Sequence, residues 1–198
     1  MLSRCCREAW FLRVAGMRHS RDASPRRKIV NDALVFGLEL LFLFCVIYAM
    51  ITDYRWLHIP NAVSILLVAG FFPFALLAGP AFPLLAHIGV AAVVFLVLFG
   101  CFAMGWLGGG DVKLAGAIML WMGPSLGPSF VALFALFGGV FALLLLLLRT
   151  ALRQYPQIGS APVLGKFSGW AQAGLCPYAL PIGAAALCMA PAIFARAA

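Results

Sequence analysis

Long apolar runs alternate with short breaks along most of this chain of 198 residues. A run of about 20 apolar residues is long enough to cross the hydrocarbon core of a bilayer as a helix. Clusters of glycine and proline separate the runs and are typical of turns. The fourth run is short unless the glycines before it also lie at membrane depth. The pattern predicts six membrane helices, with five or seven as alternatives, at about residues 33–52, 62–77, 84–104, 112–122, 130–148 and 178–194.

The composition agrees with a lipid environment. Hydrophobic residues make up 65% of the chain, charged residues only 10%, and the mean hydropathy is +1.05. A soluble domain has about 25% charged residues, which cover its water-facing surface. Because this chain lacks that polar material, we expect an all-α, polytopic membrane protein with about six transmembrane helices.

Basic charge is concentrated near the amino terminus. Residues 1–28 hold eight of the 14 basic residues and two of the six acidic residues, a net charge of +6 out of the total of +8. We therefore divide the chain into a basic, poorly ordered tail at residues 1–30 and a membrane domain at residues 31–198. Such a tail is expected to lie against anionic headgroups and does not indicate a nucleic-acid-binding surface. Met17 leaves a later translation start open.

Beyond the tail and its edge, the chain has only three acidic residues, Glu39, Asp53 and Asp111. An ionisable group within a membrane costs about 2.5–3.5 kcal/mol on insertion scales, so each of these residues is a functional candidate. Asp53 ends the first predicted helix and Asp111 begins the fourth, with two crossings between them. Both carboxylates are therefore expected at the same membrane face, together with the connection at residues 149–177. Glu39 lies inside the first helix, where we expect a structural hydrogen-bonding role.

The chemistry of two neighbouring carboxylates suits peptide hydrolysis. Two close carboxylates do not both ionise readily, so they share a proton. The ionised member can accept a proton from water, and the protonated member can polarise the scissile carbonyl. No cofactor is needed for this chemistry. No metal site is expected either, because His58 and His87 lack partners at ligand spacing and the six cysteines form no C-x-x-C pair.

The residues around each aspartate add to this interpretation. After Asp53 the chain passes through a short polar stretch to Asn61, which is placed to cap the second helix or to hold a carboxylate. Lys113, two residues after Asp111, is expected to contact either headgroups or substrate. The residues directly before Asp111 have no side chain, which permits close approach of an extended peptide; they are Gly108, Gly109 and Gly110.

These stretches resemble a known family. Asp53 with Ile-Pro-Asn at residues 59–61, and Gly-Gly-Gly-Asp-Val-Lys at residues 108–113, look like the paired signatures of type IV prepilin peptidases. The second is a G-x-G-D motif, shared more loosely with presenilin-like proteases. Residues 177–183, Pro-Tyr-Ala-Leu-Pro-Ile-Gly, resemble the family's proline-tyrosine motif, with Tyr178 followed by alanine where glycine is usual. The resemblance covers about residues 35–190.

The resemblance implies an aspartic endopeptidase with Asp53 and Asp111 as its catalytic pair. It would remove the basic leader of a prepilin-like substrate at the cytoplasmic face of the bacterial inner membrane. The longer members of the family carry a cysteine-rich insertion and also methylate the new amino terminus. Because the loop between the first two predicted helices has only about eight residues, the chain resembles the short, peptidase-only branch of the Flp/Tad pilus type, and no methyltransferase activity is expected. Asn61, Gly108, Gly109, Gly110, Lys113 and Tyr178 would bind substrate or support the pair.

The charge distribution and the family resemblance predict opposite orientations of the chain in the membrane. Nine basic residues, the eight of the tail and Arg196, lie on the face opposite the aspartates, against five on the aspartate face. Counted literally, this places the aspartates outside the cytoplasm, whereas the count without residues 1–28 is one against five and agrees with the family. Two other functions stay open: a small proton-coupled transporter with Asp53, Asp111 and Glu39 as a relay, and a non-catalytic membrane assembly subunit. Oligomeric state is left open.

Overall fold

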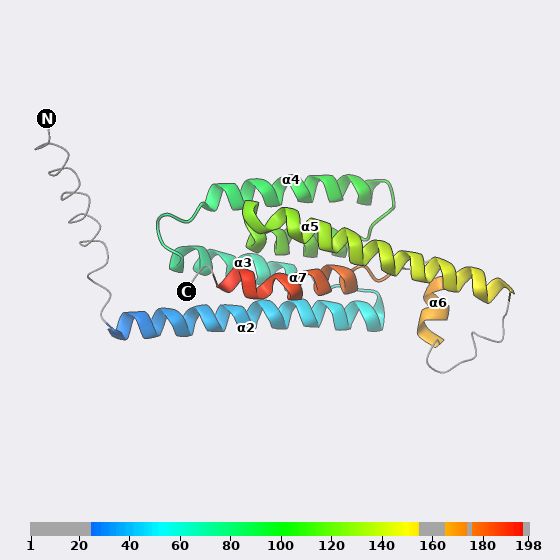
Figure 1. Cartoon of the computed structure of the whole chain (residues 1–198), viewed down its shortest axis with the longest axis horizontal. Helices are drawn as coiled ribbons and strands as arrows, with labels where there is room; N and C mark the ends of the chain where they lie inside the picture. The colour runs from blue at the N-terminus through cyan, green and yellow to red at the C-terminus, as the bar shows by residue number, and fades with distance from the viewer. Residues whose placement is uncertain (1–24, 155–164, 174–175, 196–198) are drawn as a thin grey trace, which may run out of the picture.

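The apolar runs form helices that lie side by side and alternate in direction. A computed structural model describes residues 25–154, 165–173 and 176–195. The elements, labelled as in Figure 1, are α2 (Pro25–Trp56), α3 (Asn61–Leu77), α4 (Leu84–Ala103), α5 (Gly109–Gln154), α6 (Gly165–Ala173) and α7 (Ala179–Phe194). No strand occurs within these described ranges. The predicted all-α class is confirmed.

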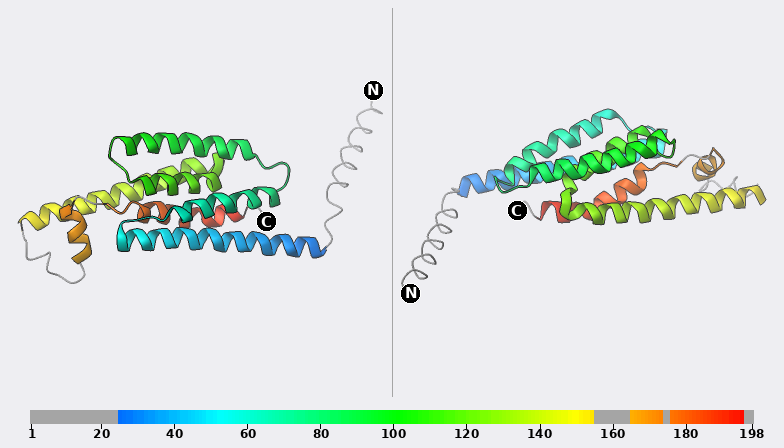
Figure 2. Two further views of the ribbon diagram at one scale, coloured as in Figure 1. Left: turned by 180° about the vertical axis from the view of Figure 1, so that it is seen from behind. Right: turned by 90° about the horizontal axis from the view of Figure 1, so that it is seen from above.

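Helix α5 contains two of the predicted segments. At Gly123 the backbone leaves helical geometry, with φ 61° and ψ −169°, and Pro124 and Pro128 follow. The chain reverses there, so that residues 109–122 form a first arm beside α4 and residues 124–154 form a second arm running back (Figures 1 and 2). The break follows directly after residue 122, where the sequence pattern ends its fourth segment. With both arms counted, the described chain contains six apolar helical segments.

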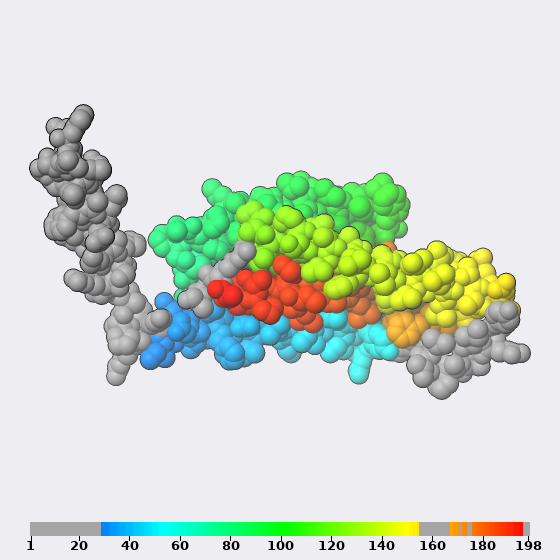
Figure 3. Space-filling view, in the orientation of Figure 1, coloured from blue at the N-terminus to red at the C-terminus, as the bar shows by residue number. Residues whose placement is uncertain are grey.

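Among the described residues, three elements are long and apolar enough to cross a membrane: Ile29–Trp56 within α2, α4, and α5 with its two arms taken together. The shorter apolar helices α3 and α7 pack within the bundle. In the space-filling view α7 fills the space between α2 and the second arm of α5 (Figure 3). Residues 1–24 of the expected tail lie outside the described residues, and residues 25–30 belong to α2.

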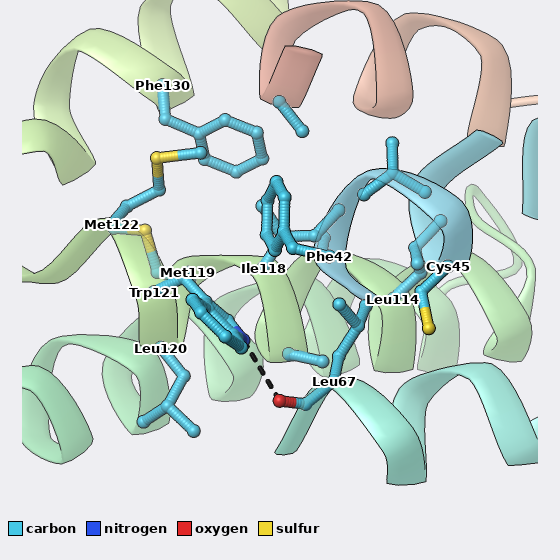
Figure 4. Packing of buried hydrophobic residues seen from close by; sticks show 14 of the residues in the cluster. Phe42, Cys45, Leu67, Leu114, Ile118, Met119, Leu120, Trp121, Met122 and Phe130 are labelled. Carbon is cyan, nitrogen blue, oxygen red and sulfur yellow. Dashed lines mark hydrogen bonds between the residues drawn. The ribbon is translucent and has the colours of Figure 1, made fainter. Parts of the chain in front are cut away.

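A core of large apolar side chains joins α2, α3, α5 and α7. Phe42, Phe71 and Trp121 are almost completely buried and pack with Phe74 and Phe194 as tilted or edge-to-face rings. The Trp121 indole N–H donates to the Leu67 carbonyl at 2.9 Å (Figure 4). This bond satisfies the one polar atom of the ring, and the core thereby holds the first arm of α5 in position.

The connection predicted at residues 149–177 contains helical structure. Helix α5 continues to Gln154 and α6 occupies residues 165–173. Trp170 of α6 is 7% exposed and packs edge-to-face on Tyr54 at the end of α2, with ring centroids 5.4 Å apart. A tertiary contact thus accounts for this tryptophan. Both α6 and the end of α2 lie at the end of the bundle that carries the two aspartates, which we call the aspartate end (Figure 1).

Candidate active site

Asp53 lies in the last turn of α2 and is held by the start of α7. Its side chain is 5% exposed, and Oδ2 accepts a hydrogen bond of 3.0 Å from the backbone N–H of Ala179, the first residue of α7. The first N–H groups of a helix have no partner within the helix and carry partial positive charge. The carboxylate therefore satisfies a helix N-terminus that lies 126 residues away along the chain.

Asp111 lies in the first turn of α5 and also faces backbone N–H groups. It is 9% exposed, and its carboxylate accepts a hydrogen bond from the backbone N–H of Gly108. A Cβ atom at Gly108 would lie 2.8 Å from Asp111 Oδ2, which is closer than real Cβ contacts. Glycine at position 108 therefore lets the carboxylate fold back over the helix start.

One oxygen of this carboxylate is unsatisfied. Within the described part of the chain, Asp111 Oδ1 is the one buried side-chain oxygen or nitrogen without a hydrogen-bond partner. Leaving a buried acceptor unpaired costs about 1–3 kcal/mol, and more when the group is charged. This oxygen keeps unused acceptor capacity, whereas every other buried polar side-chain atom of the described residues is already engaged.

The two aspartates lie close together. They are near enough for the negative charge of Asp53 to act electrostatically on the Asp111 carboxylate. Two further contacts link the segments that carry them. A Cβ at Gly110 would come within 3.2 Å of the Ile59 Cβ, so the start of α5 passes directly against the loop after α2. The Lys113 ammonium donates to the Asn61 Oδ1 at 3.0 Å.

The Asn61 contact corrects a sequence prediction. Asn61 is the first residue of α3, its preceding residue Pro60 occupies the cap position, and no side-chain cap hydrogen bond is present there. The amide oxygen of Asn61 accepts from Lys113. Asn61 thus does not cap α3 through its side chain, and its amide oxygen joins the two aspartate segments. Lys113, expected to contact headgroups or substrate, has a partner within the protein.

The segment before α7 brings two more side chains to the aspartates. The Tyr178 hydroxyl donates to the Cys176 sulfur. Burial raises the pKa of the Cys176 thiol to about 11; the hydrogen bond from Tyr178 opposes the rise, and the nearby charges of Asp111 and Asp53 add to it. Burial also raises the pKa of Tyr178, and its bonded Cys176 and the Asp111 charge raise it further.

Cys176 was not identified from the sequence as part of the site. A single cysteine inside a polar connection carries no ligand spacing. Its position two residues before Tyr178, in the stretch that resembles the proline-tyrosine motif, was the available signal. Ala179 was also missed, because its contribution is a backbone N–H, for which residue type gives no indication.

The remaining candidates lie elsewhere. Glu39 is 14 residues before Asp53 on α2, about 21 Å along a helix axis. His87 lies on α4 near its start, where its ring packs against the Gly123 break of α5. Among the described residues, no group of three or more His, Cys, Asp or Glu side chains could hold a metal ion.

The geometry assembles the parts that hydrolysis of an amide requires. Two buried carboxylates from different helices lie near enough to interact electrostatically at one end of the bundle, and both lie against helix N-termini that favour negative charge. One carboxylate oxygen, Asp111 Oδ1, has no hydrogen-bond partner among the described residues. Such a pair can hold one proton between its two members, so that a base and an acid are present together.

A comparison with protein families agrees with this chemistry. A model described as the type IV leader peptidase family matches residues 40–143, just over half of the 198 residues. The matched stretch includes Asp53, Asp111 and the residues between them that join the two segments, and it ends before α6 and α7. Comparisons with curated proteins and with solved structures found no match. The resemblance of the two aspartate motifs is thus confirmed, and the chain belongs to the type IV leader peptidase family.

Proposed function

We propose that this peptidase is an aspartic endopeptidase that removes the leader of prepilin-like substrates of the Flp/Tad type at the cytoplasmic face of the bacterial inner membrane. Asp53 and Asp111 are its catalytic residues. The observation that carries the proposal is the buried carboxylate pair, with Asp111 Oδ1 unpartnered among the described residues. Membership of the leader peptidase family supports the substrate class.

The reaction uses both members of the pair. The ionised carboxylate takes a proton from water as the water oxygen bonds to the scissile carbonyl carbon. The protonated carboxyl group gives its proton to the carbonyl oxygen, which produces a neutral tetrahedral intermediate. A proton then passes to the amide nitrogen, the C–N bond breaks, and the leader leaves with a new carboxyl group. The mature protein carries the new amino group.

The short connection between α2 and α3 supports the peptidase-only branch. Only residues 57–60 separate these helices, so no additional domain lies between them. Leu57 with φ 51° turns the chain at the end of α2. We therefore expect the product to keep an unmethylated amino terminus. Mass spectrometry of the mature product, with a methyl donor supplied, checks this, and a mass gain of one methyl group on the new terminus would contradict it.

The function is tested by reconstituting the full chain in liposomes with a Flp/Tad-type prepilin. The wild-type protein should release the leader, whereas Asp53→Asn and Asp111→Asn should each abolish release while remaining folded. Asp32→Asn is the matched control, because Asp32 is an exposed acid near the opposite end of α2. Complete processing by either aspartate variant would refute the catalytic pair.

Glu39→Gln separates the peptidase from a proton relay. A relay that includes Glu39 should lose proton flux in this variant, whereas an aspartic peptidase should keep leader release. Proton flux into the liposomes with a pH-sensitive dye, measured beside leader release, distinguishes the two functions. Flux that depends on Glu39 together with absent leader release would favour the transporter.

A further inference from the structure

An apolar groove runs along the bundle from the aspartate end. It has a volume of about 740 Å³ and lies between α3 and α4, over the first arm of α5. Seen from behind, this arm lies between the other two helices (Figure 2). Each helix contributes lining residues at helical spacing, so the apolar faces of three helices form the walls and floor of the groove. Among its lining residues only Ser64 and Lys113 are polar.

The groove is open to the surroundings of the bundle and is therefore accessible from lipid. Ile65 on its rim is 65% exposed and Phe72 is 47% exposed. Its floor is made by small residues of the first arm, Gly116 and Ala117. A Cβ at Gly116 would lie 3.0 Å from Phe95 of α4, so this glycine sets how deep the groove is.

One end of the groove adjoins the candidate active site. Lys113 lines the groove and lies two residues after Asp111, and its ammonium is bonded to Asn61 at the start of α3. From Lys113 to Leu120 the lining extends over seven residue steps, about 10 Å or two helical turns. A peptide cut at the aspartate pair and continuing into the membrane would enter the groove at this end.

The cross-section of the groove suits a helix. A volume of about 740 Å³ over about 10–12 Å of length gives a mean cross-section of about 60–75 Å². An α-helix with its side chains is about 10–12 Å in diameter, so more than half of its cross-section fits. The apolar lining would bury the side chains of such a helix without leaving polar groups unpaired.

We propose that this groove binds the apolar helix that follows the cleavage point of the substrate, and so aligns the scissile bond with Asp53 and Asp111. The proposal rests on the proposed function, since it assigns a binding site for the same substrate. The groove holds the membrane helix of the substrate, while the leader stays at the aspartate end. Recognition then depends on apolar surface and position more than on a particular side chain.

A filling variant tests the groove in the reconstituted full chain. The substrate is a reporter with a short basic leader followed by an apolar helix of about 20 residues. Ala92→Trp places a large ring in the groove, and should lower kcat/KM for the reporter by about tenfold, mainly by raising KM. Val93→Trp is the matched control, because Val93 is at the same depth on α4, is 61% exposed and does not line the groove. It should keep wild-type kinetics.

Photo-crosslinking tests the same site without filling it. A benzoyl-phenylalanine at Ile65, in the Asp111→Asn background that is expected to bind substrate without cleaving it, should form an adduct with the apolar helix of the reporter. The same group at Leu66, one residue along α3, 45% exposed and outside the groove, should not. Mapping the adduct by mass spectrometry identifies the captured segment.

Each result decides the proposal. A selective adduct at position 65 with a selective kinetic effect of Ala92→Trp supports it. If the wild type cleaves the reporter but both tryptophan variants behave alike and both probes capture alike, the groove proposal fails and the proposed function stands. Adducts at position 65 with phospholipid alone overturn it in favour of a lipid site. If the wild type cleaves no prepilin or reporter, the proposed function fails, and the groove proposal fails with it.

Discussion

The two ends of the bundle both bury polar groups, but they treat them differently. At the end opposite the aspartates, His87 is 8% exposed, and its Nδ1 lies 2.9 Å from the Leu120 carbonyl. Its ring is stacked on Phe71 and tilted against Phe82, with centroids 5.7 and 4.5 Å away. The carbonyl belongs to the last turn before the Gly123 break, so the histidine occupies the position that the interrupted helix leaves open.

At the aspartate end the polar groups are buried but not all satisfied. Asp111 Oδ1 has no partner among the described residues, and two carboxylates of like charge lie near each other. A satisfied polar group packed among aromatic rings stabilises a fold, whereas unsatisfied acids in proximity cost stability and are retained for chemistry. The comparison therefore supports a structural role for His87 and the proposed catalytic role of the aspartates, and variants can test this division.

The largest effect is expected at the aspartates. Asp53→Asn and Asp111→Asn should each lower kcat by at least about 10³-fold, and the double variant should be no worse than either alone, because the two groups act as one unit. Leader release in a single-turnover assay measures this. His87→Ala should lower thermal stability while retaining more than half of the wild-type kcat at a temperature where it is folded. If the losses of kcat from Asp53→Asn and Asp111→Asn add up in the double variant, the two aspartates do not act as one catalytic unit.

The next largest effect is expected at the opposite end. Gly123→Ala should destabilise the protein by about 3 kcal/mol, because alanine is strained at φ 61° and its Cβ would overlap the His87 ring. Thermal unfolding in detergent measures the change. Gly139→Ala is the control, since nothing lies within 4 Å of a Cβ there. Adding His87→Ala to Gly123→Ala should recover part of the lost stability, because the smaller side chain leaves room for the new Cβ. No recovery would show that the histidine does not pack against the break at Gly123.

Gly108→Ala should separate activity from stability. Its Cβ would press on Asp111 Oδ2, so the carboxylate must move away from the backbone N–H that holds it. We expect kcat to fall by about 100-fold with a stability change below about 1 kcal/mol. Gly100→Ala on α4, where a Cβ meets nothing within 4 Å, should leave both values unchanged. Equal losses in the two variants would contradict a positioning role for this glycine.

The smallest effect is expected at Cys176. Because its pKa is raised to about 11, the reactive thiolate is scarce at pH 8, and alkylation should speed up about tenfold per pH unit until pH approaches 11. Asp53→Asn removes a nearby negative charge, which should lower the pKa of Cys176 and speed alkylation at pH 8 by a few-fold. Rates come from mass spectrometry of the peptide that contains this cysteine. A rate independent of the aspartate would place the thiol away from the pair.

The sequence alone was sufficient to predict the helical segments and the shared face of the aspartates. Apolar runs and glycine-proline breaks are local features, and the break directly after residue 122 follows from the Gly123-Pro124 pair. The shared face follows from counting crossings, which needs only the number of helices between Asp53 and Asp111. Such a count is insensitive to how the helices rotate or tilt, which is why it survives errors in helix boundaries.

The tertiary structure decided which atoms meet. The partner of Asp53 is a backbone N–H 126 residues away, and the partner of Lys113 is an amide 52 residues away. These encounters depend on the rotation of each helix about its axis and on side-chain packing, which a local pattern does not encode. For that reason the capping alternative for Asn61 was wrong, and Cys176 was missed. The sequence determined at which helix ends the acids lie, and only packing determined what surrounds them.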